Sequence, residues 1–230
     1  MIEKSTLEFL DDLRRNNYKE WFHENRARYD AARENVLENA ARMVEGINRF
    51  DPSLGYPDVT KLIYRINRNL RFTADKRPYK THFGVVMNAD GDRHSPLSGY
   101  YMHVEPGGMS VVSCGLYITE EHAASLNKIR QAIDTDWEEF SAIVNEPEFR
   151  KHIGDLCRED KVLKRVPRGF SADSPAAEYL KLNHFYVWVH MADDLVTSPG
   201  YIPEALRLFK LMKPLNDFLN RIVRPIPVGL

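Results

Sequence analysis

The sequence has few of the features on which secreted, zinc-finger and membrane proteins depend. It contains only two cysteines, Cys114 and Cys157, and they form no Cys-x-x-Cys pair, so we expect two reduced, buried thiols and no disulfide or zinc framework. The opening residues, MIEKSTLEFLDDLRR, show no cationic segment followed by an apolar one, and no apolar run approaches the roughly 18 residues that a membrane span needs. These absences together favour a cytoplasmic protein with no membrane partner.

An excess of either charge is also lacking. The 32 Lys and Arg residues are balanced by 33 Asp and Glu residues, which gives a formal net charge of −1. This balance argues against a protein that coats nucleic acid non-specifically, although it leaves room for a local basic site. At 230 residues the chain is long enough to bury one sizeable core, and we expect a single domain over residues 1–230 with a loose tail from about residue 224.

Hydrophobic periodicity predicts long helices at both ends of the chain. The first helix is expected to begin at a capping box of Ser5 and Glu8, and a second is expected to run unbroken over Lys19–Arg49. A closing helix should start at Pro203, because proline is favoured in a first turn, and Pro214 should kink or split it. Three shorter helices are predicted between these, at Glu120–Asp134, Asp136–Val144 and Glu148–Arg158.

From about residue 61 onward, a period of two predicts strands. Helices come first, then a block of strands, then more helices and one late strand. This order indicates an α+β fold with a mainly antiparallel sheet of about five strands, braced by a long N-terminal helix and a C-terminal helix. The expected strands are Lys61–Asn67, Thr81–Met87, Tyr100–Glu105, Ser110–Ile118 and Phe185–Ala192.

Side-chain alternation predicts that this sheet has one apolar face and one polar face. The polar face carries histidines, aromatic residues and an arginine in place of the Lys, Glu and Thr that are typical of a merely solvated face. Such residues are typical of the floor of a concave site, although they would also suit a polar layer satisfied beneath a loop. The residues expected to line the pocket are Tyr79, His82, Tyr101, Tyr186 and Trp188.

The stretch RINRNLRFTADKRPYKTH, residues 65–82, concentrates cations around one acid, Asp75. Pro78 excludes a regular helix through its second half, so we expect a long irregular loop between two strands. Several converging cations could bind phosphate or carboxylate, but acids of the protein could also neutralise them one by one. A second basic turn, KRVPRGF, presents Arg168. The residues expected to bind an anion are Arg65, Arg68, Arg71, Lys76, Lys80 and Arg168.

The expected acid–base residues are His103, Glu105 and Asp75, because they lie on the polar face or within the basic loop. Together with His82, the first two could also supply two imidazoles and a carboxylate to zinc or iron. However, the chain has no His-Glu-x-x-His motif and no close Cys/His cluster, so the sequence favours hydrogen-bonded histidines and no metal site. No Walker or Rossmann glycine pattern is present, and no cofactor is predicted.

Three stretches, RINRNLRFTADKRPYKTH, GYYMHVEPGG and VPRGFSADSPAAEYLKLNHF, resemble the bacterial family catalogued as domain of unknown function 2461. The resemblance extends from about Thr6 to Val223, and its DKxPYK core is specific. It implies a single domain and no particular chemistry. The chain departs from the family pattern at Asn69, Ser174 and Asn183, where aspartate, histidine and lysine are implied, and Asn69 weakens any scheme that needs a carboxylate at that position.

The sequence thus predicts an anion-binding pocket where the basic loop meets the polar sheet face, in a protein that could be an enzyme acting on a small phosphorylated or carboxylated molecule. An alternative is a non-catalytic module that binds nucleic acid or an acidic protein surface, with the aromatic residues stacking on bases. A third interpretation makes the arginines part of the scaffold of a plain interaction domain.

Overall fold

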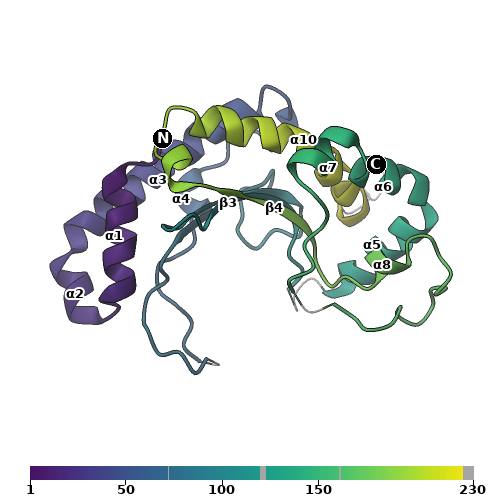
Figure 1. The fold of residues 1–230 in the computed structure, drawn as a ribbon, viewed down its shortest axis with the longest axis horizontal. Coiled ribbons are helices and arrows are strands. Elements are labelled where there is room, and N and C mark those ends of the chain that lie inside the picture. The colour runs from purple at the N-terminus through teal and green to yellow at the C-terminus, as the bar shows by residue number, and fades with distance from the viewer. Residues whose placement is uncertain (72, 120–122, 161, 225–230) are drawn as a thin grey trace, which may run out of the picture. The chain divides into compact units, whose positions relative to one another are not determined.

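The computed structural model describes residues 1–71, 73–119, 123–160 and 162–224. Within these residues the chain forms an α+β fold with ten α-helices, one short 3-10 helix and one antiparallel sheet of four strands in the order β1-β2-β3-β4 (Figure 1). The predicted fold class is confirmed, with one strand fewer than expected. The strands are β1 (Phe83–Met87), β2 (Gly99–Val104), β3 (Ser110–Leu116) and β4 (Phe185–Met191).

The strand predicted at Lys61–Asn67 is wrong. Asp58 accepts a hydrogen bond from the backbone N–H of Thr60, which caps the short helix α4 (Val59–Leu62) where the strand was expected to begin. Only two isolated antiparallel bridges follow, Ile63 with Val85 and Asn67 with Tyr79. The Asp58 cap therefore favours a helical turn over the strand that the alternating pattern predicts. The segment after α4 pairs with the chain that leads into β1 at these isolated bridges.

The predicted N-terminal helices are present, with different details. Helix α1 (Lys4–Arg15) is preceded by Glu3 as N-cap, and the hydroxyl of Ser5 donates to the Glu3 carboxylate, so the predicted Ser5–Glu8 capping box is wrong. The expected unbroken helix is divided at Asn25 into α2 (Lys19–Glu24) and α3 (Arg26–Ile47). The Asn25 side chain donates to the carbonyl of Trp21 at 2.9 Å, which is the competition with the backbone that asparagine brings to a helix interior.

Among the later helices, the one predicted at Asp136–Val144 matches to within one residue, the one predicted at Glu148–Arg158 ends at His152, and the closing helix begins at Tyr201, two residues before Pro203. The 3-10 helix η1 (Pro52–Leu54) precedes α4, and the C-terminal helix α10 continues through Pro214 without being split. Part of the predicted helix at Glu120–Asp134 and most of the predicted loose tail lie outside the described residues. No helix in the described part of the chain is both long and apolar enough to span a membrane. The remaining helices are α5 (Ala123–Thr135), α6 (Trp137–Val144), α7 (Pro147–His152), α8 (Ala177–Leu180), α9 (Asp193–Val196) and α10 (Tyr201–Val223).

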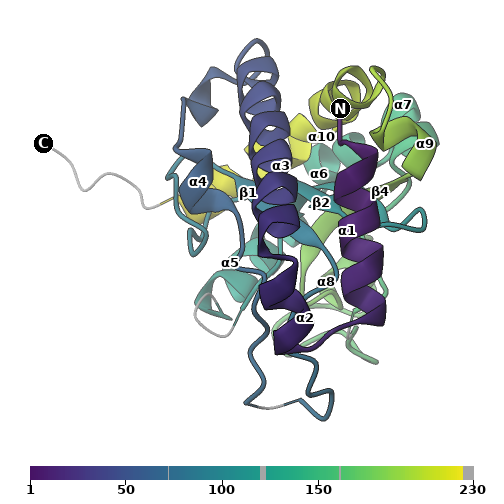
Figure 2. The same ribbon diagram turned by 90° about the vertical axis from the view of Figure 1, so that its left-hand side faces the viewer.

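The chain folds into two compact units, and unit 1 consists of Met1–Arg93, Tyr101–Val112 and His190–Arg207. In unit 1, α1 and α3 lie side by side (Figure 2). Aromatic rings join α2 and α3 to the start of the sheet, since Phe22 contacts Tyr29 at 5.1 Å between ring centroids and Tyr29 contacts Phe83 at 5.9 Å. This aromatic core supports β1 and the segment that leads into it.

Unit 2 consists of His94–Tyr100, Ser113–Val189 and Leu208–Leu230. Its core is also aromatic, because the ring of Phe140 contacts Tyr179 at 5.1 Å and Phe218 at 5.4 Å. Both cysteines are buried thiols, as predicted. The expectation of a single domain over residues 1–230 stays a prediction.

Candidate functional site

The basic stretch forms an arm, residues 64–71 and 73–82, that projects from unit 1 past the end of β1 (Figures 1 and 2). Its two sides are joined by backbone hydrogen bonds from Arg68 to Pro78 at 2.9 Å and from Lys80 to Ile66 at 2.8 Å. The predicted irregular connection is present in the described part of the arm, but it leads from α4 into β1 and does not join two strands of the sheet. Asn17, which follows α1, also holds the arm. Its side chain donates to the carbonyl of Tyr79 and accepts from the N–H of Tyr79, each at 3.0 Å.

The side chain of Tyr79 belongs to the core of unit 1. It is 6% exposed, and its ring stacks on Phe22 with 4.1 Å between centroids and 17° between planes. Tyrosine was expected here as a lining residue because it lies among cations. Because Tyr79 is buried against Phe22, it instead anchors the arm to α2.

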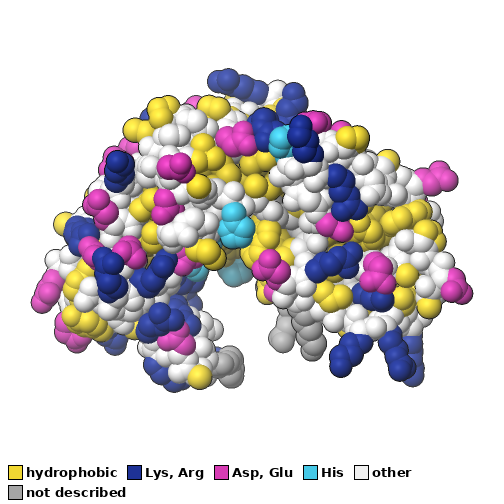
Figure 3. All heavy atoms as spheres, viewed as in Figure 1, with side chains coloured by type: hydrophobic (Ala, Val, Ile, Leu, Met, Phe, Trp, Pro, Cys, Tyr) yellow, Lys and Arg dark blue, Asp and Glu magenta, His cyan; other side chains and the backbone are white. Residues whose placement is uncertain are grey.

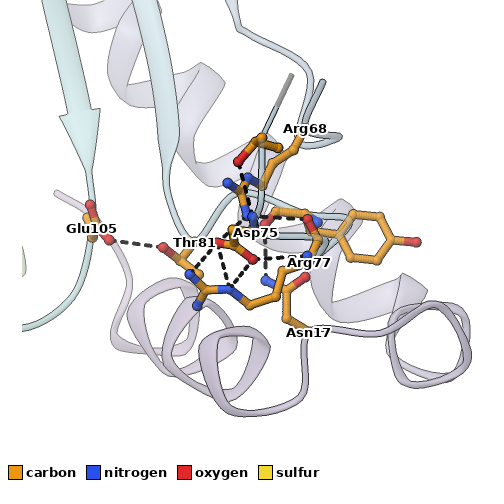
Figure 4. Close-up of polar contacts among 8 residues, drawn as sticks. Asn17, Arg68, Asp75, Arg77, Thr81 and Glu105 are labelled. Carbon is orange, nitrogen blue, oxygen red and sulfur yellow. Dashed lines mark hydrogen bonds and ion pairs between the residues drawn. The ribbon is translucent and has the colours of Figure 1, made fainter. Parts of the chain in front are cut away.

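The outer half of the arm is neutralised internally by Asp75 (Figure 4). Arg68 and Arg77 approach this carboxylate from two sides, each with a nitrogen–oxygen distance of 2.6 Å. Hydrogen bonds from Arg77 and then from Arg68 hold the pKa of Asp75 well below its usual range. The ammonium of Lys76 donates to the carbonyl of Leu70 at 3.3 Å. Figure 3 shows the same pattern as Lys and Arg side chains gathered around an acidic one on the arm.

The inner end of the arm is different, because the positive charges of Arg65 and Arg93 act on Lys80. Lys80 is half-buried, and its Nζ lies 5.4 Å from the centroid of the Tyr64 ring. Burial and the nearby charges of Arg65 and Arg93 lower the pKa of Lys80. Arg93 is held in place by a 2.7 Å hydrogen bond to the carbonyl of Ile63. Among the described residues no carboxylate pairs with Lys80. We call Arg65, Lys80 and Arg93 the cation cluster.

Next to the cation cluster, β2 presents three polar side chains on one face. The burial of β2 alternates between half-buried and buried residues, as the sequence predicts, and Tyr101 and His103 are on the half-buried side with Glu105 just beyond the strand. The Tyr101 hydroxyl lies 3.1 Å from His103 Nδ1, and His103 Nε2 lies 2.9 Å from Glu105 Oε2. These contacts form a continuous chain from a phenol through an imidazole to a carboxylate.

In the neighbouring strand β1, Gly84 leaves space for the hydrogen-bonded side chains of Tyr101, His103 and Glu105. A β-carbon on Gly84 would overlap the Tyr101 hydroxyl, so glycine allows the phenol to lie directly against β1. Because Tyr101 is enclosed in this way, burial raises its pKa far above the ordinary value. The ring of Tyr64 meets Tyr101 edge to face at 6.4 Å, which links the chain to Lys80 through consecutive ring contacts.

Glu105 receives contacts from three directions. Thr81 donates to its Oε1 at 3.0 Å, as Figure 4 shows, and Arg14 of α1 lies 3.5 Å from the same oxygen. Burial alone would raise the pKa of Glu105, but the hydrogen bonds from His103 and Thr81 outweigh it and lower this pKa. Glu105 is therefore ionised at neutral pH, and its Oε2 points to the histidines.

His82 completes the group, which we call the histidine cluster: His82, His103 and Glu105. The ring of His82 stacks on His103 with 4.3 Å between centroids, and its Nδ1 lies 4.0 Å from Glu105 Oε2. Burial, and then the neighbouring imidazole of His103, lower the pKa of His82 to about 4. At neutral pH His82 is therefore uncharged and has a free ring lone pair. These three residues are also the ones that could hold a metal ion, since one ligand atom from each lies within 4.8 Å of the others.

Of the remaining predicted residues, Arg71 is exposed on the arm in unit 1, and Tyr186, Trp188 and Arg168 belong to unit 2. The hydroxyl of Tyr186 donates to Asp160 at 2.6 Å, and the ring of Trp188 meets that of Tyr186 edge to face at 5.8 Å. Arg168 is exposed in the connection that leads to α8. The structure thus brings His82, Tyr101, His103 and Glu105 together in unit 1, with Lys80 close by. It ties Tyr186 and Trp188 to partners in unit 2.

A depression of about 700 Å³ also lies in unit 2, where α6, α7 and α10 meet, and it is lined by Ile143, Phe149, Leu211 and Phe218 with several charged neighbours. None of the predicted site residues lines it. This depression therefore does not support the predicted pocket between the basic loop and the polar sheet face.

Four contributors to the site escaped sequence reasoning: Arg14, Tyr64, Thr81 and Arg93. Tyr64 could have been found, because it directly precedes Arg65 at the start of the basic stretch. Arg14 could not, because it reaches Glu105 from a helix about 90 residues earlier in the chain, and no local pattern records that contact.

Comparison with known proteins gives one match. The family model described as "Conserved hypothetical protein (DUF2461)" matches residues 5–218, which is nearly the whole chain and includes the arm and both clusters. The search of curated proteins and the search of solved structures each found no match.

Proposed function

The chain belongs to the family of conserved hypothetical proteins DUF2461, and we propose that its unit 1 binds a small phosphorylated or carboxylated molecule at the cation cluster. The observation that carries this proposal is the environment of Lys80. Its ammonium group is half-buried beside two guanidinium groups, and among the described residues no carboxylate balances it. A cluster of this kind is the environment that a bound anion would stabilise.

Crowding like charges around Lys80 costs free energy. Burial and the two arginines already lower the pKa of Lys80, so the charged ammonium is less stable here than in water. An anionic oxygen between these groups would reverse that effect, because each charge-assisted hydrogen bond contributes roughly 1.5–3 kcal/mol. The Tyr64 ring beneath the ammonium keeps the side chain directed toward the same place.

The cations of the outer arm have another role in this proposal. Arg68 and Arg77 are occupied by Asp75, and Lys76 by a backbone carbonyl, so these residues hold the arm in shape. Asp75 is likewise a structural residue, because its carboxylate already accepts hydrogen bonds from Arg77 and pairs with Arg68. Arg71 is exposed and would at most attract an anion from a distance.

The Tyr101–His103–Glu105 chain gives the bound molecule a neighbouring group that can move a proton. Ionised Glu105 accepts the Nε2–H of His103, which leaves Nδ1 as the acceptor of the Tyr101 hydroxyl. This arrangement orients the imidazole as general acid–base groups are oriented in enzymes. We therefore retain His103 and Glu105 as the proton-transfer residues of the proposed site.

Thermal unfolding with a panel of small anions tests the binding step. The panel comprises inorganic phosphate, sugar phosphates, nucleoside monophosphates and di- and tricarboxylates at low ionic strength. A ligand that binds the folded state stabilises it by about 2.7 kcal/mol at one hundred times its Kd. We expect at least one member of the panel to raise the Tm of the wild-type protein.

Two matched variants show whether the effect comes from the cation cluster. Lys80→Gln and Lys76→Gln each remove one positive charge from the same arm, but only the first removes it from the cluster. We expect Lys80→Gln to lose the ligand-induced rise in Tm and Lys76→Gln to keep it. Equal responses of the two variants would contradict the proposal. Polynucleotide binding whose affinity falls linearly with salt on a log–log scale would favour the nucleic-acid alternative instead.

A further inference from the structure

We propose that the histidine cluster is a site for a divalent transition-metal ion, with His82, His103 and Glu105 as its three protein ligands. The sequence alone favours hydrogen-bonded histidines, because His82 is 21 positions from His103 and no metal motif joins them. The fold removes that objection. The pairing of β1 with β2 places the residue before β1 beside a polar side chain of β2, and the two imidazole rings stack at 4.3 Å.

The separations of the ligand atoms suit one shared ion. His103 Nε2 and Glu105 Oε2 are 2.9 Å apart, and two ligands at about 2.0–2.2 Å from one ion are separated by roughly 3 Å. His82 Nδ1 lies 4.0 Å from the same oxygen, which is too far for a hydrogen bond and requires an approach of only about 1 Å to coordinate. The ring of His82 therefore faces the carboxylate, and within the described residues it makes no hydrogen bond that would account for this direction.

The groups around the three ligands are those that orient metal ligands in proteins. Thr81 and Arg14 contact Glu105 Oε1, which leaves Oε2 directed toward the histidines. The other ring nitrogen of His103 is hydrogen-bonded to the Tyr101 hydroxyl, which would accept the Nδ1–H of a histidine that coordinates through Nε2. Such outer contacts fix the ring orientation and tautomer of ligating histidines.

The donor set also indicates the class of metal. Two imidazole nitrogens and one carboxylate oxygen favour Zn²⁺, Fe²⁺ or Co²⁺ over Mg²⁺ and Ca²⁺, which prefer oxygen ligands. Three protein ligands leave at least one coordination position open, as in catalytic and not structural zinc sites. The side chains of His82, His103 and Glu105 are 30%, 16% and 20% exposed, so an ion can reach them from solvent.

The metal site shares His103 and Glu105 with the proposed proton-transfer group, so an ion bound there would take the place of that group, but none of its three ligands belongs to the cation cluster. The metal could nevertheless serve the same molecule, since Lys80 lies close enough to influence His82. The two proposals therefore require separate tests, one with a metal and no organic anion, and the other with an anion and a chelator.

Metal titration of chelator-treated, tag-free protein tests the inference. We expect wild-type protein to bind one equivalent of Co²⁺ with visible absorption bands, and Zn²⁺ to displace it. His82→Gln and His103→Gln should each weaken Zn²⁺ binding by more than about 100-fold, because loss of an outer partner alone costs about 10- to 100-fold. Thr81→Val, which keeps all three ligands, should weaken binding by about 10-fold.

The matched control is His152→Gln. His152 lies 3.2 Å from Glu148 on α7, so it forms a histidine–glutamate pair that has no part in the histidine cluster. This variant should bind Zn²⁺ as the wild-type protein does. The inference is overturned if wild-type protein binds no stoichiometric Co²⁺ or Zn²⁺ at micromolar concentrations, or if His82→Gln, folded by circular dichroism, binds as tightly as His152→Gln.

Discussion

Replacing His82 by glutamine should remove a large part of the acid sensitivity of the folded protein in the absence of metal. The imidazole is stacked on His103, and the charged groups that face it are Glu105 and Lys80. Burial and the neighbouring imidazole disfavour its protonated form more than Glu105 favours it, and the pKa of His82 falls from 6.5 to about 4.

The sign of the effect follows from which state binds the proton more tightly. Between about pH 4 and pH 6.5, the unfolded chain protonates His82 and the folded chain does not. The free energy of unfolding should therefore decrease as the pH falls from about 6.5 to about 4. Above pH 6.5, His82 should not contribute to the pH dependence of the free energy of unfolding. At about 1.36 kcal/mol per pH unit the upper limit is about 3 kcal/mol. Because the side chain is 30% exposed, we expect about 2 kcal/mol.

Urea unfolding with a chelator, at half-unit steps from pH 7 to pH 4.5, measures this quantity. The wild-type free energy of unfolding should decrease by about 2 kcal/mol more than that of His82→Gln over the window, and His82→Asn should behave like His82→Gln. The lower limit of pH 4.5 keeps most carboxylate titration out of the comparison. Parallel pH profiles for wild type and both variants would show that His82 is not held uncharged by its surroundings.

Two further predictions concern the supports of the site. Gly84→Ala would place a methyl group against the Tyr101 hydroxyl and should reduce the free energy of unfolding by about 1–3 kcal/mol, and a double variant with Tyr101→Phe should recover part of this loss in urea titrations. A Gly84→Ala protein as stable as the wild type would refute the close packing of β1 and Tyr101. Asp75→Asn would release Arg68 and Arg77, so trypsin should cleave the arm faster with little change in Tm; unchanged cleavage would mean that Asp75 does not hold the arm.

Much of the fold follows from local sequence patterns, and the exceptions have physical causes. The strands at residues 83–87, 99–104, 110–116 and 185–191 were predicted to within two residues at their ends. Burial alternates along β2 and the first half of β4, whereas β1 and β3 are buried nearly throughout. The missing strand was lost to Asp58, whose side chain caps a helical turn. The division at Asn25 has a similar origin, since its amide bonds the carbonyl four residues earlier. Both are side-chain effects that period counting ignores.

The candidate site was predictable in part. Alternation along β2 placed Tyr101, His103 and Glu105 on one face, and the structure shows them hydrogen-bonded in that order. The basic stretch drew attention to the arm but could not show which cations would find partners. Asp75 neutralises Arg68 and Arg77, and only folding reveals that Lys80 is left beside Arg65 and Arg93.

The pKa of Lys80, measured by carbon-detected NMR of its side chain with Lys80→Gln for assignment, tests the anion site most directly. In metal-free protein this pKa should lie below the ordinary 10.5. Inorganic phosphate at matched ionic strength should raise it, because a bound anion favours the charged amine. A pKa of Lys80 that phosphate leaves unchanged, or moves no more than that of Lys76, would contradict binding at the cation cluster.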